Sequence, residues 1–153
     1  MTDVGAADRS ERAPSSRSVA IEFAIPSDVR FIENIVERVA KTCEEMAFAP
    51  HQVSLNVPVA LTEALSNAIL RGNGGDIEKV VRVRARVDDT SLVLEVADEG
   101  TGFDLDTCTI DPTRAENLER EDGRGLYLMR RLMDRVERFT DNGNVVRLVL
   151  LKP

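Results

Sequence analysis

The stretch KVVRVRARVDDTSLVLEVAD, residues 79–98, decides the fold class of this chain. Apolar and polar residues alternate in both halves, which is the period of a strand with one buried face. The short turn over residues 88–90 makes the two strands a hairpin. Arg82, Arg84 and Arg86 fall on the opposite face of the first strand. We interpret them as the solvated side of the sheet, with a surface for an acidic partner as the alternative.

A strand and two helices precede this hairpin. Apolar residues alternate over 19–25, and Ser27 with Asp28 offers a helix cap after that strand. Apolar residues then recur at helical spacing up to Met46, which predicts a helix of about 18 residues.

The second helix begins near Pro50 or Val53 and continues to about residue 70. Pro58 in its early part predicts a kink or a start near that position. The glycines within 72–75 end the helix.

A polar stretch, a helix and two strands follow the hairpin. Residues 104–122 show little pattern beyond a short helical stretch near 112–119, and a loop of this length is often a functional lid. We predict a helix over 125–137, a short strand near 137–141 and a last strand over 145–151. This order lacks the alternation of a doubly wound parallel sheet. It predicts a two-layer α/β sandwich, with helices on one face of a mixed sheet.

The composition is that of one globular domain in a chain of 153 residues. Residues 1–17 are polar and free of aromatic residues, so we expect a disordered N-terminal tail before a domain over 18–153. The start is unlike a signal peptide, and no apolar run approaches the roughly 20 residues of a membrane span. We therefore expect a cytoplasmic protein with no membrane partner. The net charge of −7 disfavours phosphate backbones, so no direct nucleic acid partner is expected.

Cysteine and histidine are scarce and lack metal-ligand spacing. Cys43, Cys108 and His51 are the whole set, so we expect no zinc site. Cys43 lies on the apolar side of a helical pattern and is interpreted as a small core residue. His51 is interpreted as a helix-start or surface residue.

The stretch TEALSNAILRGN, residues 62–73, contains the first candidate site residues. Glu63 and Asn67 are four residues apart and therefore lie on the same side of the second helix. A carboxylate and an amide in this arrangement suit a general base and a hard oxygen ligand for Mg²⁺. A solvated polar stripe is the alternative.

The stretch VADEGTGFD, residues 96–104, leaves the end of a strand. Asp98 could accept a hydrogen bond from an exocyclic amine, and Gly100 and Gly102 would let a flat ring approach the backbone. An ordinary strand-exit turn is the alternative. The third glycine and the following helix of a dinucleotide fingerprint are missing.

The stretch EDGRGLYLMRRLMD, residues 121–134, places Gly123, Arg124 and Gly125 before the predicted third helix. Backbone N–H groups at a helix start favour an anion such as phosphate, and Arg124 would add positive charge. A flexible lid hinge is the alternative. The apolar face of this helix is interpreted as core packing, and comprises Leu126, Met129, Leu132, Met133 and Val136. Together, the three stretches predict an adenine nucleotide site.

EALSNA, DEGTGFD and GRGLYLM, in this order and with a polar lid between the last two, resemble the GHKL ATPase superfamily. Gyrase, histidine kinases and MutL share its Bergerat fold. The leading strand and the phrase GRGLYLMRRLMDRV are similar to one branch, the bacterial anti-sigma-factor serine/threonine kinases of partner-switching pathways. The resemblance covers about residues 18–152, and it implies a histidine-kinase-like ATPase domain that uses ATP and Mg²⁺.

The resemblance also implies roles for the residues. Glu63 matches the catalytic carboxylate that accepts the proton of a substrate serine, and Asn67 matches the residue that holds Mg²⁺ against the phosphates. Asp98 matches the aspartate that binds the adenine amino group, with Gly100 and Gly102 shaping that pocket.

The second glycine box comprises Gly123, Arg124, Gly125 and Leu126 and would lie at the phosphates, while 104–122 matches the nucleotide lid. Two positions depart from the family pattern. Arg71 stands where the family often has His, and it would lie near the phosphates or form a solvated helix end. Asn144 stands where the family often has a threonine close to the adenine aspartate.

The function implied by the resemblance is that of an ATP-dependent serine/threonine protein kinase and anti-sigma factor. It would sequester a sigma factor, phosphorylate a STAS-domain anti-anti-sigma antagonist and form a homodimer through its first strand and helix. One alternative is a non-catalytic nucleotide-sensing binding module of the same fold. A histidine-kinase catalytic fragment is disfavoured, because no phosphoacceptor-histidine helix precedes the domain.

Overall fold

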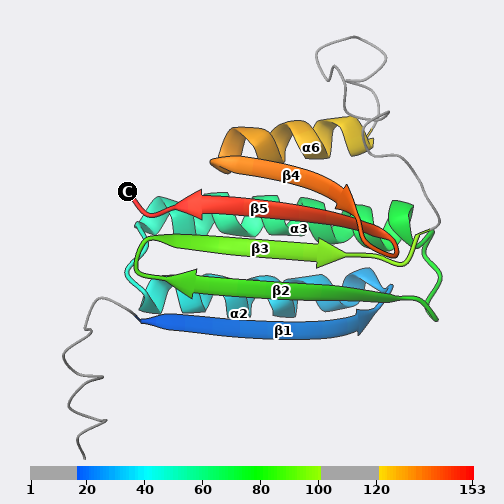
Figure 1. Cartoon of the computed structure of the whole chain (residues 1–153), viewed down its shortest axis with the longest axis horizontal. Coiled ribbons are helices and arrows are strands. Elements are labelled where there is room, and N and C mark those ends of the chain that lie inside the picture. The colour runs from blue at the N-terminus through cyan, green and yellow to red at the C-terminus, as the bar shows by residue number, and fades with distance from the viewer. Residues whose placement is uncertain (1–16, 101–120) are drawn as a thin grey trace, which may run out of the picture.

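The computed structural model of the protein describes residues 17–100 and 121–153. The strands are β1 (Ser18–Pro26), β2 (Val80–Asp88), β3 (Ser91–Ala97), β4 (Arg135–Thr140) and β5 (Asn144–Leu151). The main helices are α2 (Ile32–Glu45), α3 (Val57–Asn67) and α6 (Glu121–Leu132). Figure 1 shows α2 and α3 behind the sheet, with α6 beside β4. The predicted tail over 1–17 and most of the predicted lid lie outside the described residues and stay predictions.

The five strands form one sheet in the order β1-β2-β3-β5-β4, and every neighbouring pair is antiparallel. The predicted two-layer sandwich is confirmed, but the expected mixed sheet is wrong. β3 and β4 run in the same direction, as a strand–helix–strand unit around α6 would place them (Figure 1). β5 returns from β4 by a hairpin and inserts between these two strands, so each of them meets only an antiparallel neighbour.

The β1–α2 junction forms as its sequence predicts. Asp28 is extended and its side chain accepts a hydrogen bond from Arg30 N at 2.9 Å, which caps a short 3₁₀ turn over Val29–Phe31 before α2. Cys43 on α2 is fully buried, and burial raises the pKa of its thiol to about 12. The interpretation of Cys43 as a core residue is confirmed, because a thiol with so high a pKa stays protonated and unreactive.

The second helix is continuous from Pro50 to Gly72, and α3 is its middle part. A wider π-helical turn over Gln52–Asn56 precedes α3. Pro58 sits in the first turn of α3, where the missing N–H is tolerated, so the helix widens instead of breaking. At the helix start, Gln52 Oε1 accepts a hydrogen bond from Ala49 N at 3.1 Å, and His51 is exposed as expected.

The apolar stripe of α3 forms the centre of the hydrophobic core. Its fully or almost fully buried members are Val57, Ala60, Leu61, Ala64 and Leu65. By length and composition alone, the segment Gln52–Gly72 would qualify as a membrane span. The apolar stripe lies instead within one core shared by the sheet and the helices, which is the pattern of a core helix.

The glycines after α3 end the helix as predicted. Asn73 N donates a hydrogen bond to Ala68 O at 2.9 Å, which closes a last π-helical turn over Ala68–Gly72, and Gly75 N donates to Ile69 O at 2.8 Å just after it. Gly74 and Gly75 have φ values of +63° and +71°, a conformation that side chains with a Cβ rarely adopt.

The third helix begins earlier than the sequence predicts. α6 starts at Glu121 and therefore includes Gly123, Arg124 and Gly125, and it ends at Leu132, before β4. Directly after these glycines, Leu126, Met129 and Met133 are buried with α3 in the same core. Burial of an apolar face outweighs the low helix propensity of glycine. Val136 belongs to β4, not to this helix.

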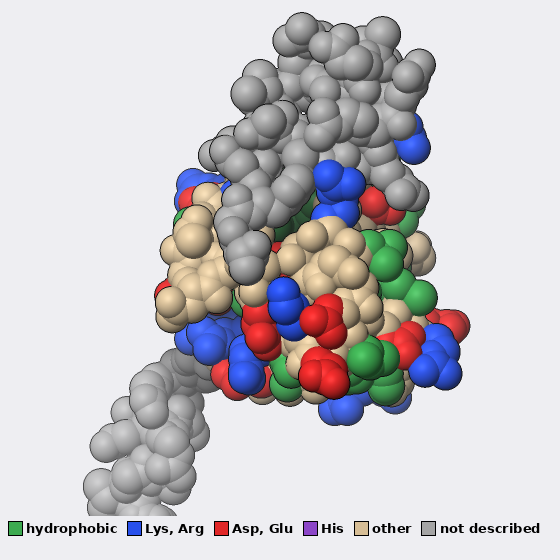
Figure 2. Space-filling model, turned by 90° about the vertical axis from the view of Figure 1, so that its right-hand side faces the viewer, with side chains coloured by type: hydrophobic (Ala, Val, Ile, Leu, Met, Phe, Trp, Pro, Cys, Tyr) green, Lys and Arg blue, Asp and Glu red, His purple; other side chains and the backbone are tan. Residues whose placement is uncertain are grey.

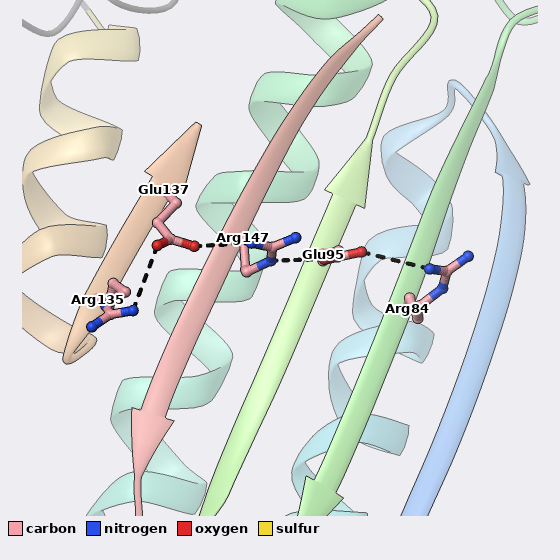
Figure 3. A network of polar contacts seen from close by, with 5 residues as sticks. All are labelled: Arg84, Glu95, Arg135, Glu137 and Arg147. Atoms are coloured by element: carbon pink, nitrogen blue, oxygen red, sulfur yellow. Dashed lines mark hydrogen bonds and ion pairs between the residues drawn. The ribbon is translucent and has the colours of Figure 1, made fainter. Parts of the chain in front are cut away.

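The open face of the sheet carries a row of alternating charges across all five strands: Glu22, Arg84, Glu95, Arg147 and Glu137. Arg147 Nε lies 2.7 Å from Glu95 Oε2, and Arg147 Nη1 lies 3.1 Å from Glu137 Oε1 (Figure 3). The three arginines of β2 are exposed, which confirms the solvated side of that strand. Exposed ion pairs of this kind stabilise a fold only slightly.

Two leucines of the second helix test this packing. We expect Leu65→Ala to lower the free energy of unfolding by about 2–5 kcal/mol, because Leu65 is fully buried and its removal leaves a cavity. Leu70→Ala is the control, since Leu70 is 51% exposed, and it should change stability by no more than about 0.5 kcal/mol. Urea denaturation measures both. Equal losses in the two variants would contradict the assigned core.

Candidate functional site

The candidate residues gather at one end of the molecule. The second helix ends there, β3 leaves the sheet, the β4–β5 turn closes and α6 begins (right-hand side of Figure 1). Figure 2 looks onto this end, where backbone and uncharged polar side chains make up much of the described surface, with acidic and basic side chains beside them. The topology thus brings together segments that are far apart in the sequence.

Glu63 and Asn67 both point from α3 towards the backbone of α6 at Gly125. A Cβ atom placed on Gly125 would lie 2.6 Å from Glu63 Oε1 and 3.4 Å from Asn67 Nδ2. Both side chains are half-buried. The glycine therefore leaves room for a carboxylate and an amide to lie side by side against the first turns of α6.

A second group surrounds Asp98 at the exit of β3. Asp98 is 8% exposed, and its Oδ1 accepts hydrogen bonds from Gly100 N at 2.7 Å, Asn144 N at 3.2 Å and Asn144 Nδ2 at 3.4 Å. These three hydrogen bonds, all within the described parts of the chain, hold Oδ1, while Oδ2 lies against the backbone of Gly72.

Glycines allow the loops around Asp98 to approach closely. A Cβ on Gly72 would overlap the Asp98 carboxylate, and a Cβ on Gly100 would overlap the Gly72 carbonyl oxygen. Gly143 has a φ of +137° and packs against the Asp98 carbonyl. These contacts join the end of the second helix, the exit of β3 and the β4–β5 turn into one wall of the candidate site.

Burial raises the pKa of Asp98 above its ordinary value of 3.8. The hydrogen bonds from Gly100 and Asn144 and the charge of Lys79 act in the opposite direction but do not cancel the effect of burial. A buried carboxylate is a strong acceptor for an N–H donor that replaces water.

The two groups are linked by one continuous helix. Gly72 follows Glu63 by nine residues, so at about 1.5 Å per residue the two positions are roughly 13 Å apart along the helix axis. The site is therefore elongated, with an acceptor for an amine at one end and a carboxylate with an amide at the other.

The early start of α6 changes the role of its glycine box. The first four N–H groups of a helix, counted from its N-cap, lack i→i−4 partners within it, and in α6 these include the N–H groups of residues 121–123. Gly123 and Arg124 thus lie in the first turn, where an anion is favoured. Gly125 lies beyond those four groups and contributes its lack of a side chain. Leu126 is 3% exposed in the core, so only its backbone could reach a ligand.

The structure says less about two other residues that the sequence analysis predicted for the site. Arg71 is exposed in the last turn of its helix, on the same element as Asn67. Gly102 lies outside the described residues. The sequence analysis overlooked Asn73, which is 2% exposed; its position among glycines is typical of a turn, and no local signal indicates its burial.

The side-chain oxygen atoms of Glu63 and Asn67 near α6 suit a hard cation that is held mainly by the oxygens of a bound phosphate ligand. Residues 17–100 and 121–153 contain no group of three or more His, Cys, Asp or Glu side chains suited to hold a metal ion. Mg²⁺ commonly takes one or two protein oxygens and completes its shell with phosphate oxygens and water. Asn67, with Glu63 beside it, matches that requirement.

Comparisons with known proteins identify similar chains. The family described as "Histidine kinase-like ATPase domain" matches residues 25–150. "Anti-sigma F factor" from Clostridium beijerinckii is 28% identical over 141 residues, covering 90% of this chain and 95% of that protein. "Serine-protein kinase RsbW" from Bacillus subtilis is 29% identical over 133 residues, covering 84% of this chain and 82% of that protein.

A solved structure shows the same fold. The crystal structure of the RsbU and RsbW domains of Rv1364c from Mycobacterium tuberculosis superposes with a TM-score of 0.63 at 14% sequence identity. The match covers 88% of this chain but only 33% of that longer chain. At this identity the likeness concerns the fold alone.

Two aspartates with opposite pKa shifts test the description of the site. Because the pKa of Asp98 is raised, the folded protein holds that proton more tightly than the unfolded chain does. The ionised carboxylate therefore costs stability, and the cost grows as the pH rises from 3.8 through the raised pKa. We expect Asp98→Asn to be more stable than wild type at pH 7, with the difference shrinking as the pH falls through this window.

Asp88→Asn is the control. Hydrogen bonds from Thr90 and Ser91 lower the pKa of Asp88, so its charge stabilises the fold above its ordinary pKa and the stabilisation is lost as the pH falls through the lowered value. This variant should be slightly less stable than wild type at pH 7. Urea denaturation between pH 4 and 7 measures the change in the free energy of unfolding of both variants, and so its sign. Destabilisation by Asp98→Asn at pH 7 would contradict the cost assigned to the buried charge.

Proposed function

The chain belongs to the histidine kinase-like ATPase domain family, and on that basis we propose that it is an ATP-dependent serine/threonine protein kinase that also acts as an anti-sigma factor. The observation that carries the proposal is the placement of Glu63 and Asn67 against Gly125, on the helix whose end borders Asp98. Relatives named as an anti-sigma factor and as a serine-protein kinase support it.

Asp98 would recognise the adenine base of ATP. Its Oδ2 would accept a hydrogen bond from the exocyclic amine of adenine, while Gly100 N and Asn144 hold Oδ1. Guanine carries a carbonyl oxygen at the equivalent position, which the buried carboxylate would repel. Asn144 thus keeps a side-chain donor to the aspartate where the family often has threonine, and Gly102 would extend the pocket.

The phosphates would lie between the second helix and α6. The N–H groups at the start of α6, including that of Gly123, would bind anionic oxygens, and Arg124 and Arg71 would add positive charge. Gly125 would admit the phosphates next to Glu63. Asn67 would hold Mg²⁺, which supplies neutralisation of the phosphate charge.

Glu63 would act as the general base. As the serine hydroxyl oxygen of the substrate attacks the γ-phosphorus, its proton passes to the Glu63 carboxylate, the new O–P bond forms and the bond to the β-phosphate oxygen breaks to release ADP. Phosphoryl transfer mainly requires positioning and charge neutralisation, so a single carboxylate is sufficient as the base.

The proposed partners are a sigma factor, which the protein would sequester, and a STAS-domain anti-anti-sigma antagonist, which would be the phosphorylation substrate. A homodimer through β1 and α2 is part of the proposal. β1 supports it as an edge strand of the sheet, since its outer backbone groups have no strand partner among the described residues.

Calorimetry with ATP tests the base pocket. Wild type should bind ATP in a Mg²⁺-dependent manner, and Asp98→Asn should bind at least about tenfold more weakly, because an amide N–H₂ would face the adenine amine. Asp88→Asn, the same chemical change in a distant turn, should bind like wild type. Binding by Asp98→Asn at wild-type strength would refute the role of Asp98, and a wild type that binds no ATP would refute the nucleotide site.

Phosphoryl transfer tests Glu63. We expect Glu63→Gln to slow transfer from radiolabelled ATP to a purified STAS-domain protein by about 10²–10⁴-fold, since the proton acceptor is lost. ATP affinity should be nearly unchanged. Glu137→Gln, on the opposite layer of the protein, is the charge-matched control and should transfer at the wild-type rate.

The outcomes separate the two candidate functions. A Glu63→Gln variant that transfers phosphate at the wild-type rate would exclude Glu63 as the base. ATP binding without transfer by wild type to any STAS-domain protein tested would favour the non-catalytic binding module.

A further inference from the structure

Asn73 is a buried polar residue in a glycine-rich loop, whose sequence alone would suggest a flexible linker. It follows Gly72 directly and precedes Gly74, yet its side chain is 2% exposed. A buried amide costs stability unless both of its ends are hydrogen-bonded. The partners of this side chain therefore indicate what it holds together.

Three hydrogen bonds connect the Asn73 side chain to three different segments. Its Nδ2 donates to Ser27 Oγ at 2.9 Å and to Val80 O at 3.1 Å, at the end of β1 and the start of β2. Its Oδ1 accepts from Glu99 N at 2.7 Å, in the loop that leaves β3. The amide is thus a junction between the end of the second helix and three strand ends.

The bond to Glu99 is the one that concerns the site. Asp98 and Glu99 are consecutive, as are Gly72 and Asn73, so the two pairs face each other. The Asp98 carboxylate lies against Gly72 without room for a Cβ, and one residue further on the Asn73 amide binds the Glu99 backbone. Glu99 Oε2 also accepts a hydrogen bond from Val80 N at 2.9 Å, which holds the same loop from its other side.

We infer that Asn73 is a positioning residue that fixes the Asp98 loop against the end of the second helix and so sets the preference of the site for an adenine base. This inference rests on the proposed function, because it assigns Asp98 to the base. In the described part of the chain, the Asn73 side chain bonds to Ser27, Val80 and Glu99 and not to the phosphate end of the site, at Glu63, Asn67 and α6, so the two ends should respond differently to its loss.

The geometry requires an asparagine. One short side chain must supply two donors to Ser27 and Val80 and one acceptor to Glu99, and of the small side chains only the asparagine amide has this combination. Aspartate lacks the donors, and the hydroxyl of serine has a single one. The loss of the acceptor leaves the Glu99 N–H without its partner and frees the loop that carries Asp98.

The test compares Asn73→Ala with Ser27→Ala. Ser27 is also buried, at 4% exposure, and its hydroxyl donates to Lys79 O and accepts from Asn73 Nδ2. Among the residues that the structure describes, the Ser27 side chain makes no hydrogen bond to residues 98–100. Both variants remove hydrogen bonds from the same buried group, but only Asn73→Ala releases the Asp98 loop.

Two probes are titrated by calorimetry in the presence of Mg²⁺: ATP, and inorganic tripolyphosphate, which lacks the base. We expect Asn73→Ala to bind ATP about tenfold more weakly while its affinity for tripolyphosphate stays within about twofold of wild type. Ser27→Ala should leave the ratio of the two affinities unchanged. Thermal melting measures the stability loss of each variant.

Two results would overturn the inference. In one, Asn73→Ala melts earlier but keeps the wild-type ratio of affinities, so the residue only stabilises the fold. In the other, both probes weaken together, so its loss disturbs the whole site. If Asn73→Ala does not fold, Asn73→Ser takes its place, since the shorter hydroxyl side chain cannot replace all three bonds. A wild type that binds no ATP would instead refute the proposed function.

Discussion

Burial of the apolar stripe of α3 is the constraint on which the rest of the structure depends. This helix lies in the layer behind the sheet and shares one core with α2, α6 and the inner faces of the strands. Because a helix buries only one stripe, the residues outside the stripe can carry polar groups. Glu63 and Asn67 are such residues, and the same packing that stabilises the fold directs them towards α6.

The site combines close backbone contacts with a buried charge. Gly72, Gly100, Gly125 and Gly143 each occupy a position where a Cβ would meet a carboxylate or a carbonyl group. Asp98 stays in this wall although burial raises its pKa and its ionised form costs stability. A carboxylate kept at such a cost is typical of a residue retained for binding rather than for folding.

Local patterns predicted most of the elements. The alternation over 79–98 predicts the β2–β3 hairpin, and helical spacing predicts α2 and the long second helix, because each of these signals is contained within its own segment. The start of α6 could not be predicted in this way. Glycine disfavours a helix locally, and only packing of Leu126 and Met129 in the shared core outweighs that preference.

The sequence by itself determined most of the secondary structure, the two-layer class and the types of residue in the candidate site, since these follow from periodicity and side-chain chemistry. Tertiary structure alone decided the insertion of β5 between β3 and β4, which makes the sheet antiparallel. It also decided the contact of Gly72 with Asp98 and the bond of Asn73 to Glu99. The contact and the bond both join residues about 25 positions apart. No local sequence pattern encodes a contact between segments that meet only when the chain folds.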